Sequence, residues 1–382
     1  MNSTERPRLS VRSPGDLVAA VPYLLGFHPA DSIVVVAVRG RRVVFAARGD
    51  LPGAGVDPAP AARHLAEVVA RQEVDAATVV GYGPAARVTG TVDAVGDALD
   101  AAGLTVLDAL RVTDGRWWSY LCAEPACCPA DGTPYDPVAS QVGAAAVFAG
   151  QVALPDRAAL AAQVSALDGP VRLAMRRATA RARRRLAVLA GASVDGAPPE
   201  DVTVGVPADV PPTGETSAEG PPAEGDPMVV VGSGGAARAV RAAGVAAVRA
   251  AFRRQRRGER LDDDEVAWLT VLLTHIPVRD HAWSRTDGRD TDISLWTDVL
   301  RRAEPDLIGA PGSLLAFAAW RAGHGALAAV ALERVLTAHP DHSLAVILDD
   351  ALRRGLAPSE LDGWPVVTGS SVLRRRRRGP RR

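Results

Sequence analysis

The sequence predicts an α/β N-terminal domain, with a mixed sheet flanked by helices, followed by an all-α C-terminal domain. Two observations support this order. Before residue 191, β-branched apolar runs alternate with amphipathic helical patterns, which is typical of a sheet covered by helices. Beyond residue 232, apolar residues recur at helical spacing with almost no strand candidates. The stretch between them is rich in Pro, Gly and acidic residues, so we expect a flexible linker.

The first helix and strand are the clearest local prediction. Ser13 can cap a helix that begins with Pro14, where the missing N–H costs nothing. Gly26 can end that helix in the left-handed conformation, and residues 32–38 form a β-branched run typical of a strand buried on both faces. Pro22 lies inside the helical pattern, so we expect it to kink the helix or end it early.

The remaining elements of the first domain follow from periodicity and turn residues. We expect strands over residues 42–48, 76–82, 104–112 and 116–121, and helices over 58–71, 85–102, 138–149, 157–167 and 170–190. The last of these helices carries seven arginines spread widely around it, so we expect it to lie across the outside of the α/β domain.

In the second domain we expect helices over residues 236–254, 262–275, 294–302, 312–322, 325–338 and 343–354. Residues 312–340 fit a tetratricopeptide-like helix pair. One such pair cannot bury its own face, so the neighbouring helices must complete the stack.

The predicted organisation is therefore an α/β domain (1–190), a flexible Pro/Gly/acidic linker (191–232), an all-α domain (233–365) and a disordered Arg-rich tail (366–382). The chain has 44 basic and 44 acidic residues, but seven of the basic ones are arginines of the tail. That tail could associate with nucleic acid without sequence preference, and it could equally be a solubilising end.

Composition favours the cytosol. The chain contains only three Cys, which argues against a disulfide framework. It has no apolar run of the length of a transmembrane helix, and its N-terminus lacks the apolar segment of a secretory signal. We therefore expect a cytoplasmic protein.

Several phrases resemble one known family. They are PYLLGFHPADSIVVVAV, CCPADGTPYDP, VRDHAW and LLAFAAWRAGHGALAAVALERVL. With these phrases the chain resembles an uncharacterised family of actinobacterial proteins known only as a domain of unknown function. The resemblance covers most of the chain except the linker and the tail, and it implies no activity.

The first candidate ligand site combines His28 and Asp31, in the turn before the first strand, with Cys122, Cys127 and Cys128. Three thiolates so close in sequence could hold zinc, with His28 or His64 as a fourth ligand. The C-x4-C-C spacing differs from a C-x2-C knuckle, however, and free cysteines are often small apolar side chains of a structural loop. A redox or nucleophilic thiol is the remaining alternative, but it needs positively charged neighbours. The sequence therefore favours the loop and predicts no metal.

The second candidate site is the charged segment between two predicted helices that contains Arg279, Asp280, His281 and Trp283. Close ionisable groups shift one another's pKa values, so the segment could bind a ligand or exchange protons. It could also be a solvated loop with surface ion pairs.

No complete catalytic constellation or cofactor motif is evident. Gly232, Gly234 and Ala237 have dinucleotide-motif spacing, but the second strand and the acidic residue that such a site needs are missing. The sequence therefore indicates no cofactor and favours a non-enzyme.

We expect a binding or scaffold protein whose helical domain binds a protein partner. The alternatives are an enzyme or small-molecule sensor with its site in the α/β domain, and nucleic-acid association through the tail.

Overall fold

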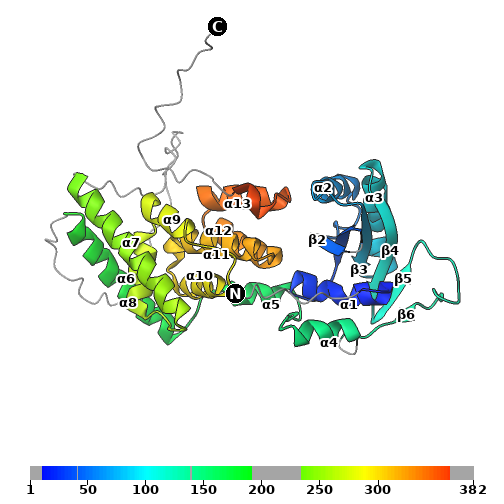
Figure 1. Ribbon diagram of the computed structural model, residues 1–382, viewed down its shortest axis with the longest axis horizontal. Helices are drawn as coiled ribbons and strands as arrows, with labels where there is room; N and C mark the ends of the chain where they lie inside the picture. The colour runs from blue at the N-terminus through cyan, green and yellow to red at the C-terminus, as the bar shows by residue number, and fades with distance from the viewer. Residues whose placement is uncertain (1–10, 41, 138–139, 192–233, 362–382) are drawn as a thin grey trace, which may run out of the picture.

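The computed structural model describes residues 11–40, 42–137, 140–191 and 234–361. They form an α/β unit and a helical unit that lie side by side (Figure 1). The α/β fold of the first part and the helix-rich second part are therefore confirmed. The predicted linker, after Gly191, and the Arg-rich tail lie outside the described residues.

The α/β unit contains one six-stranded sheet with the order β2-β1-β3-β4-β5-β6. Its strands are β1 (Ser32–Arg39), β2 (Arg42–Asp50), β3 (Ala76–Tyr82), β4 (Thr105–Thr113), β5 (Arg116–Ser119) and β6 (Thr133–Pro134). Among the described strands of this sheet, β3 and β4 are the one parallel pair, with α3 (Ala85–Ala101) as the crossover between them. The other neighbours are antiparallel, so the sheet is mixed, as the sequence predicted.

Helices cover both faces of the sheet, which explains why β1 is apolar along its length. Val35 and Val79 face α3 and α2 (Ala59–Ala70), whereas Val34 and Val80 face α1 (Pro14–Leu25). Successive side chains of a strand point to opposite faces, so both sets are buried. Helix α1 continues beyond Pro22 to Leu25 and ends at Gly26, which is left-handed (φ +83°). Of the two outcomes expected at Pro22, the early end is therefore wrong and the kink stays a prediction.

Ser13 caps α1, because its hydroxyl accepts a hydrogen bond from the N–H of Asp16 at 3.1 Å. Replacing Ser13 with alanine leaves that N–H without its cap, and we expect a loss of about 1 kcal/mol of unfolding free energy. Ser13→Gly should cost only a few tenths of that, about 0.3 kcal/mol. Urea unfolding followed by circular dichroism measures both, and equal losses in the two variants would contradict the capping role.

The helical unit contains α5 (Arg157–Val164), α6 (Pro170–Leu189), α7 (Gly234–Arg256), α8 (Asp263–Leu272), α9 (Ile276–Trp283), α10 (Asp290–Arg302), α11 (Gly309–Arg321), α12 (Gly325–Ala338) and α13 (Ser343–Arg353). Helix α9 occupies part of the segment that the sequence suggested as a loop. Helices α11 and α12 pack on one another, and α11 is buried from Gly309 to Trp320. The tetratricopeptide-like pairing and the protein partner for these helices stay predictions.

Helix α6 does not lie across the α/β unit. It packs on α8, and its buried residues Met175, Ala178, Ala182 and Leu186 join the hydrophobic cluster of the helical unit. Leu160 and Val164 of α5 belong to the same cluster. Two helices that precede the predicted boundary near residue 191 therefore pack with the helical unit, and the boundary itself stays a prediction.

The two units meet at the turn after α1. Phe27 is 2% exposed and joins the hydrophobic cluster of the helical unit, and it forms a β-bridge with Leu154. The side chain of Gln72, just after α2, donates a hydrogen bond to the carbonyl of Gly355, beyond α13, at 2.6 Å. Among the described residues, no helix has the length and apolar character needed to span a membrane.

Candidate metal centre

The three cysteines lie in the loop between β5 and β6. One aromatic and one cationic side chain of β5, Trp118 and Arg116, hold this loop in place. The indole N–H of Trp118 donates to the carbonyl of Ala130 at 3.1 Å, and Arg116 donates to the carbonyl of Gly132 at 2.8 Å. Gly132 is left-handed, and a Cβ atom there would lie 2.4 Å from the Trp118 ring. The loop therefore folds back tightly over β5.

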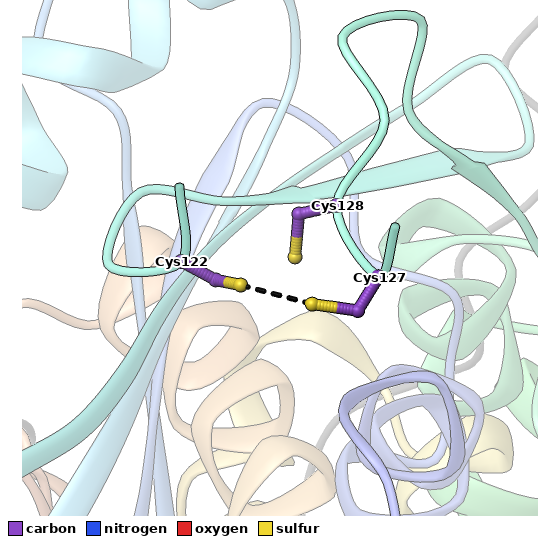
Figure 2. Close-up of side chains that lie close together, drawn as sticks. All are labelled: Cys122, Cys127 and Cys128. Atoms are coloured by element: carbon purple, nitrogen blue, oxygen red, sulfur yellow. Dashed lines mark hydrogen bonds between the residues drawn. The ribbon is translucent and has the colours of Figure 1, made fainter. Parts of the chain in front are cut away.

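Backbone hydrogen bonds orient the cysteines toward one another. The N–H groups of Cys127 and Cys128 both donate to the carbonyl of Glu124, at 3.2 and 2.8 Å. The N–H of Cys122 donates to the hydroxyl of Ser119 at 3.1 Å, and that hydroxyl donates to Asp108 on β4 at 2.7 Å. Two separate turns, each fixed by its own bonds, thus bring the three thiols to one place (Figure 2).

The three sulfur atoms lie close enough together to share a metal ion. The Sγ atoms of Cys122 and Cys127 are 3.1 Å apart, and all three sulfurs lie within 4.8 Å of one another. Zinc binds thiolates at about 2.3 Å in tetrahedral geometry, which places ligand sulfurs about 3.8 Å apart. Cys127 is exposed and the other two are half-buried, so a fourth coordination position would face solvent.

Hydrogen bonds among the thiols set their protonation. A hydrogen bond from Cys127, and a smaller contribution from a hydrogen bond with Cys128, lower the pKa of Cys122. The bond with Cys122, together with burial, raises the pKa of Cys127 and raises that of Cys128 to about 12. The charged side chains acting on the cluster are acidic, Asp108 on Cys122 and Glu124 on Cys127. Such neighbours disfavour a bare thiolate nucleophile and favour a bound cation.

His28 and Asp31 are not part of this cluster. The N–H of His28 donates to the carbonyl of Leu154 at 2.9 Å, at the junction of the two units. Asp31 is exposed, has φ +41°, and accepts a hydrogen bond from the N–H of Leu51 at its carbonyl, as a turn residue does. In the described part of the chain, the residues placed to share a metal ion are the three cysteines alone, without His28 or His64.

The sequence did not single out Ser32 and Tyr82, which face each other across β1 and β3. Both are buried, and neither hydroxyl has a hydrogen-bond partner in the described structure. Burial raises the pKa of Tyr82 well above its ordinary value. The signal available in the sequence was Ser32, a polar residue at the start of the otherwise apolar β1.

The second candidate site is divided between different roles along α9. Arg279 forms an ion pair with Asp280 at 3.0 Å, and Trp283 stacks on Phe317 with a ring separation of 3.7 Å. His281 has a buried Nε2 atom without a partner among the described residues, and burial followed by nearby arginines lowers its pKa. These four side chains therefore do not converge on one ligand.

A family described as a domain of unknown function (DUF4192) matches residues 14–359. The chain belongs to this family. The DUF4192 match includes the sheet, the cysteine loop and the helical unit, and it confirms the resemblance seen in the sequence, whereas the actinobacterial source stays a prediction. No curated protein and no solved structure matches the chain. The family description assigns no activity, so the function must be inferred from the site itself.

Proposed function

We propose that the protein binds zinc through Cys122, Cys127 and Cys128 and offers the fourth position of the metal to a ligand from solution. The convergence of three sulfurs from two independently fixed turns supports this proposal. Structural zinc sites are closed by four protein ligands, whereas sites that bind a further molecule keep one position open. The proposal therefore describes a metal-dependent sensor or binding protein.

Thiolate softness and the number of sulfurs favour zinc over the other uses of such a cluster. Soft sulfur ligands select zinc and copper(I) over magnesium or calcium. A disulfide between Cys122 and Cys127 would use two sulfurs and leave Cys128 without a role. A zinc ion engages all three.

An open groove of about 870 Å³ lies next to the cysteine loop and gives a ligand room beside the metal. It runs between α3 and β4, and Tyr120 and Leu121, which directly precede Cys122, contribute to its lining. Asp93, Asp97 and Asp100 of α3 line another part. A ligand that reached from the metal into this groove would carry positive charge or hydrogen-bond donors.

The test is the metal content of the full chain purified without a metal-binding tag. We expect about one zinc per chain and slow reaction of all thiols with a disulfide reagent until a chelator is added. The chain has three cysteines in total, so the thiol count reports on this cluster alone. With cobalt(II) in place of zinc, added imidazole should change the visible spectrum if the fourth position is open.

Cys128→Ser should abolish stable zinc binding, because two sulfurs remain. His28→Ala and His64→Ala are matched controls and should keep the full zinc content, since the structure places neither residue with the sulfurs. Three freely reactive thiols in a chain that takes up no added zinc would overturn the proposal. Reversible oxidation of two thiols without metal uptake would replace it with a redox pair.

A further inference from the structure

Two neighbouring helices of the helical unit carry positive charge without any negative charge. Helix α6 contains seven arginines and α7 contains six, and neither contains an acidic residue. The whole chain has equal numbers of acidic and basic residues, 44 of each, so this imbalance is local. The two helices contact one another and lie along the outer side of the helical unit (Figure 1).

Some of these arginines are paired within the fold. Arg172, Arg181 and Arg183 form ion pairs with Glu304, Asp264 and Asp306, and Arg254 pairs with Glu265. Other arginines of these helices are exposed, lie over no aromatic ring, and have no carboxylate partner within 4 Å among the described residues. They are Arg176, Arg177 and Arg184 on α6, and Arg238, Arg241, Arg249 and Arg253 on α7. Arg256 has no such carboxylate partner either, and lies 5.9 Å from the Phe252 ring.

On α7 the unpaired arginines form one stripe. At about 100° per residue, Arg238, Arg241, Arg249, Arg253 and Arg256 fall within about a third of the helix circumference. They extend over about 27 Å of the helix axis, at about 1.5 Å per residue. The buried residues occupy the adjoining arc, from Val240 round to Phe252, and Phe252 lies at the edge of the stripe beside Arg241. We call these five residues the α7 arginine stripe.

Arg285, which follows α9, places more positive charge beside this stripe. A Cβ atom at Gly244 would lie 2.2 Å from a methyl group of Val278, so α7 and α9 approach closely there. Arg241 and Arg249 of the stripe, together with Arg285, act electrostatically on His281. The acidic groups around α9 are already engaged: Asp280 pairs with Arg279, Asp287 pairs with Arg321, and Asp292 is buried and accepts the N–H of Asp287. Asp292 also lies within electrostatic range of Arg256.

The arrangement suits a long, regular polyanion. A duplex presents about one phosphate charge per 1.7 Å of its axis, so a row of guanidinium groups can contact several phosphates at once. Single strands are recognised by stacking on exposed aromatic side chains, and α7 exposes none. Insertion into a membrane surface needs exposed large apolar side chains. Helix α7 exposes none, but α6 exposes Val171, Leu173 and Val188, so vesicle binding is measured beside duplex binding.

We propose that the α7 arginine stripe, supported by the unpaired arginines of α6 and by Arg285, binds the phosphate backbone of duplex nucleic acid without reading its sequence. This binding is independent of the zinc proposal. It also assigns to the folded helical unit a contact that the sequence suggested only for the Arg-rich tail.

The experiment measures binding of a labelled 30-base-pair DNA duplex by fluorescence anisotropy over a series of salt concentrations. The stripe variant carries Arg241→Gln, Arg249→Gln, Arg253→Gln and Arg256→Gln in the full chain. We expect at least a tenfold loss of affinity near 0.1 M salt, and a salt dependence whose logarithmic slope falls by about 3 to 4, because each lost phosphate contact contributes about 0.9.

The control variant removes the same charge from arginines that are already paired: Arg260→Gln, Arg289→Gln, Arg353→Gln and Arg354→Gln. We expect its affinity to stay within about twofold. Repeating both measurements in a chain that ends at Val372 removes the contribution of the Arg-rich tail. The loss of affinity in the stripe variant should persist in that chain. Unchanged binding by the stripe variant, equal losses in both variants, or binding of phosphatidylserine vesicles but not of duplex DNA would each overturn the proposal.

Discussion

Replacing Trp296 with alanine is expected to lower the free energy of unfolding by about 4 kcal/mol. Trp296 lies on α10, is 0% exposed, and packs edge-on against Phe252 of α7 with ring centroids 5.8 Å apart. Its indole N–H donates to the hydroxyl of Thr286 at 3.0 Å, which ties the segment after α9 to α10. Alanine would leave a large cavity at the point where α7, α9 and α10 meet.

Urea unfolding followed by far-ultraviolet circular dichroism measures this loss without relying on tryptophan fluorescence. Trp296→Phe keeps the aromatic packing and removes the N–H donor, so we expect about half the loss, roughly 2 kcal/mol. Thr286 still donates to the carbonyl of Ala282 in both variants. A loss below about 1 kcal/mol for Trp296→Ala would mean that the surrounding helices collapse onto the vacated volume.

Local patterns predicted most of the α/β unit because its elements depend on neighbouring residues. The strand expected over residues 76–82 is β3, from Ala76 to Tyr82, and the helix expected over 85–102 is α3, from Ala85 to Ala101. The order of strands in the sheet and the parallel pairing of β3 with β4 depend on contacts distant in sequence, and periodicity alone does not supply them.

The helical unit shows where such reasoning stops. Helix α9 was missed because Arg279, Asp280 and His281 obscure its short apolar face, which consists of Val278 and Ala282. The prediction that α6 packs across the α/β unit was wrong for a different reason. An apolar stripe containing Met175 and Leu186 shows that a helix packs against something, but it does not say against which element.

The cysteine site was only partly predictable. The sequence named all three cysteines, but spacing along the chain argued against a metal knuckle. The missing information was the turn at Glu124, whose carbonyl accepts hydrogen bonds from the N–H groups of Cys127 and Cys128 and directs both toward Cys122. No pattern in the sequence pointed to Ser119 or Asp108, which fix Cys122 from the sheet side.

Replacing Arg302 with methionine is expected to cost about 3 kcal/mol of unfolding free energy. Arg302, in the last turn of α10, is 5% exposed, and its guanidinium donates to the carbonyls of Leu261 and Asp262 at 2.8 to 3.1 Å. It also forms ion pairs with Asp263 and Asp298 at 3.4 and 3.6 Å. The side chain thus joins the end of α10 to the residues that begin α8.

Methionine fills similar volume but offers no donor, so the carbonyl of Leu261 would be buried without its partner, which accounts for most of the expected loss. Loss of the two ion pairs contributes less to the expected change, because Asp263 is partly exposed and Asp298 also pairs with Arg260 at 2.7 Å. Arg302→Lys should recover only part of the loss, since an ammonium group cannot reproduce the planar fork that reaches both carbonyls.

Arg354→Met is the matched control, because its ion pair with Asp350 is exposed, and it should cost less than about 1 kcal/mol. Urea unfolding of the three variants under the same conditions measures their free energies of unfolding. Equal stability of Arg302→Lys and the unaltered chain would show that charge alone, rather than the two-carbonyl contact, holds α8 to α10.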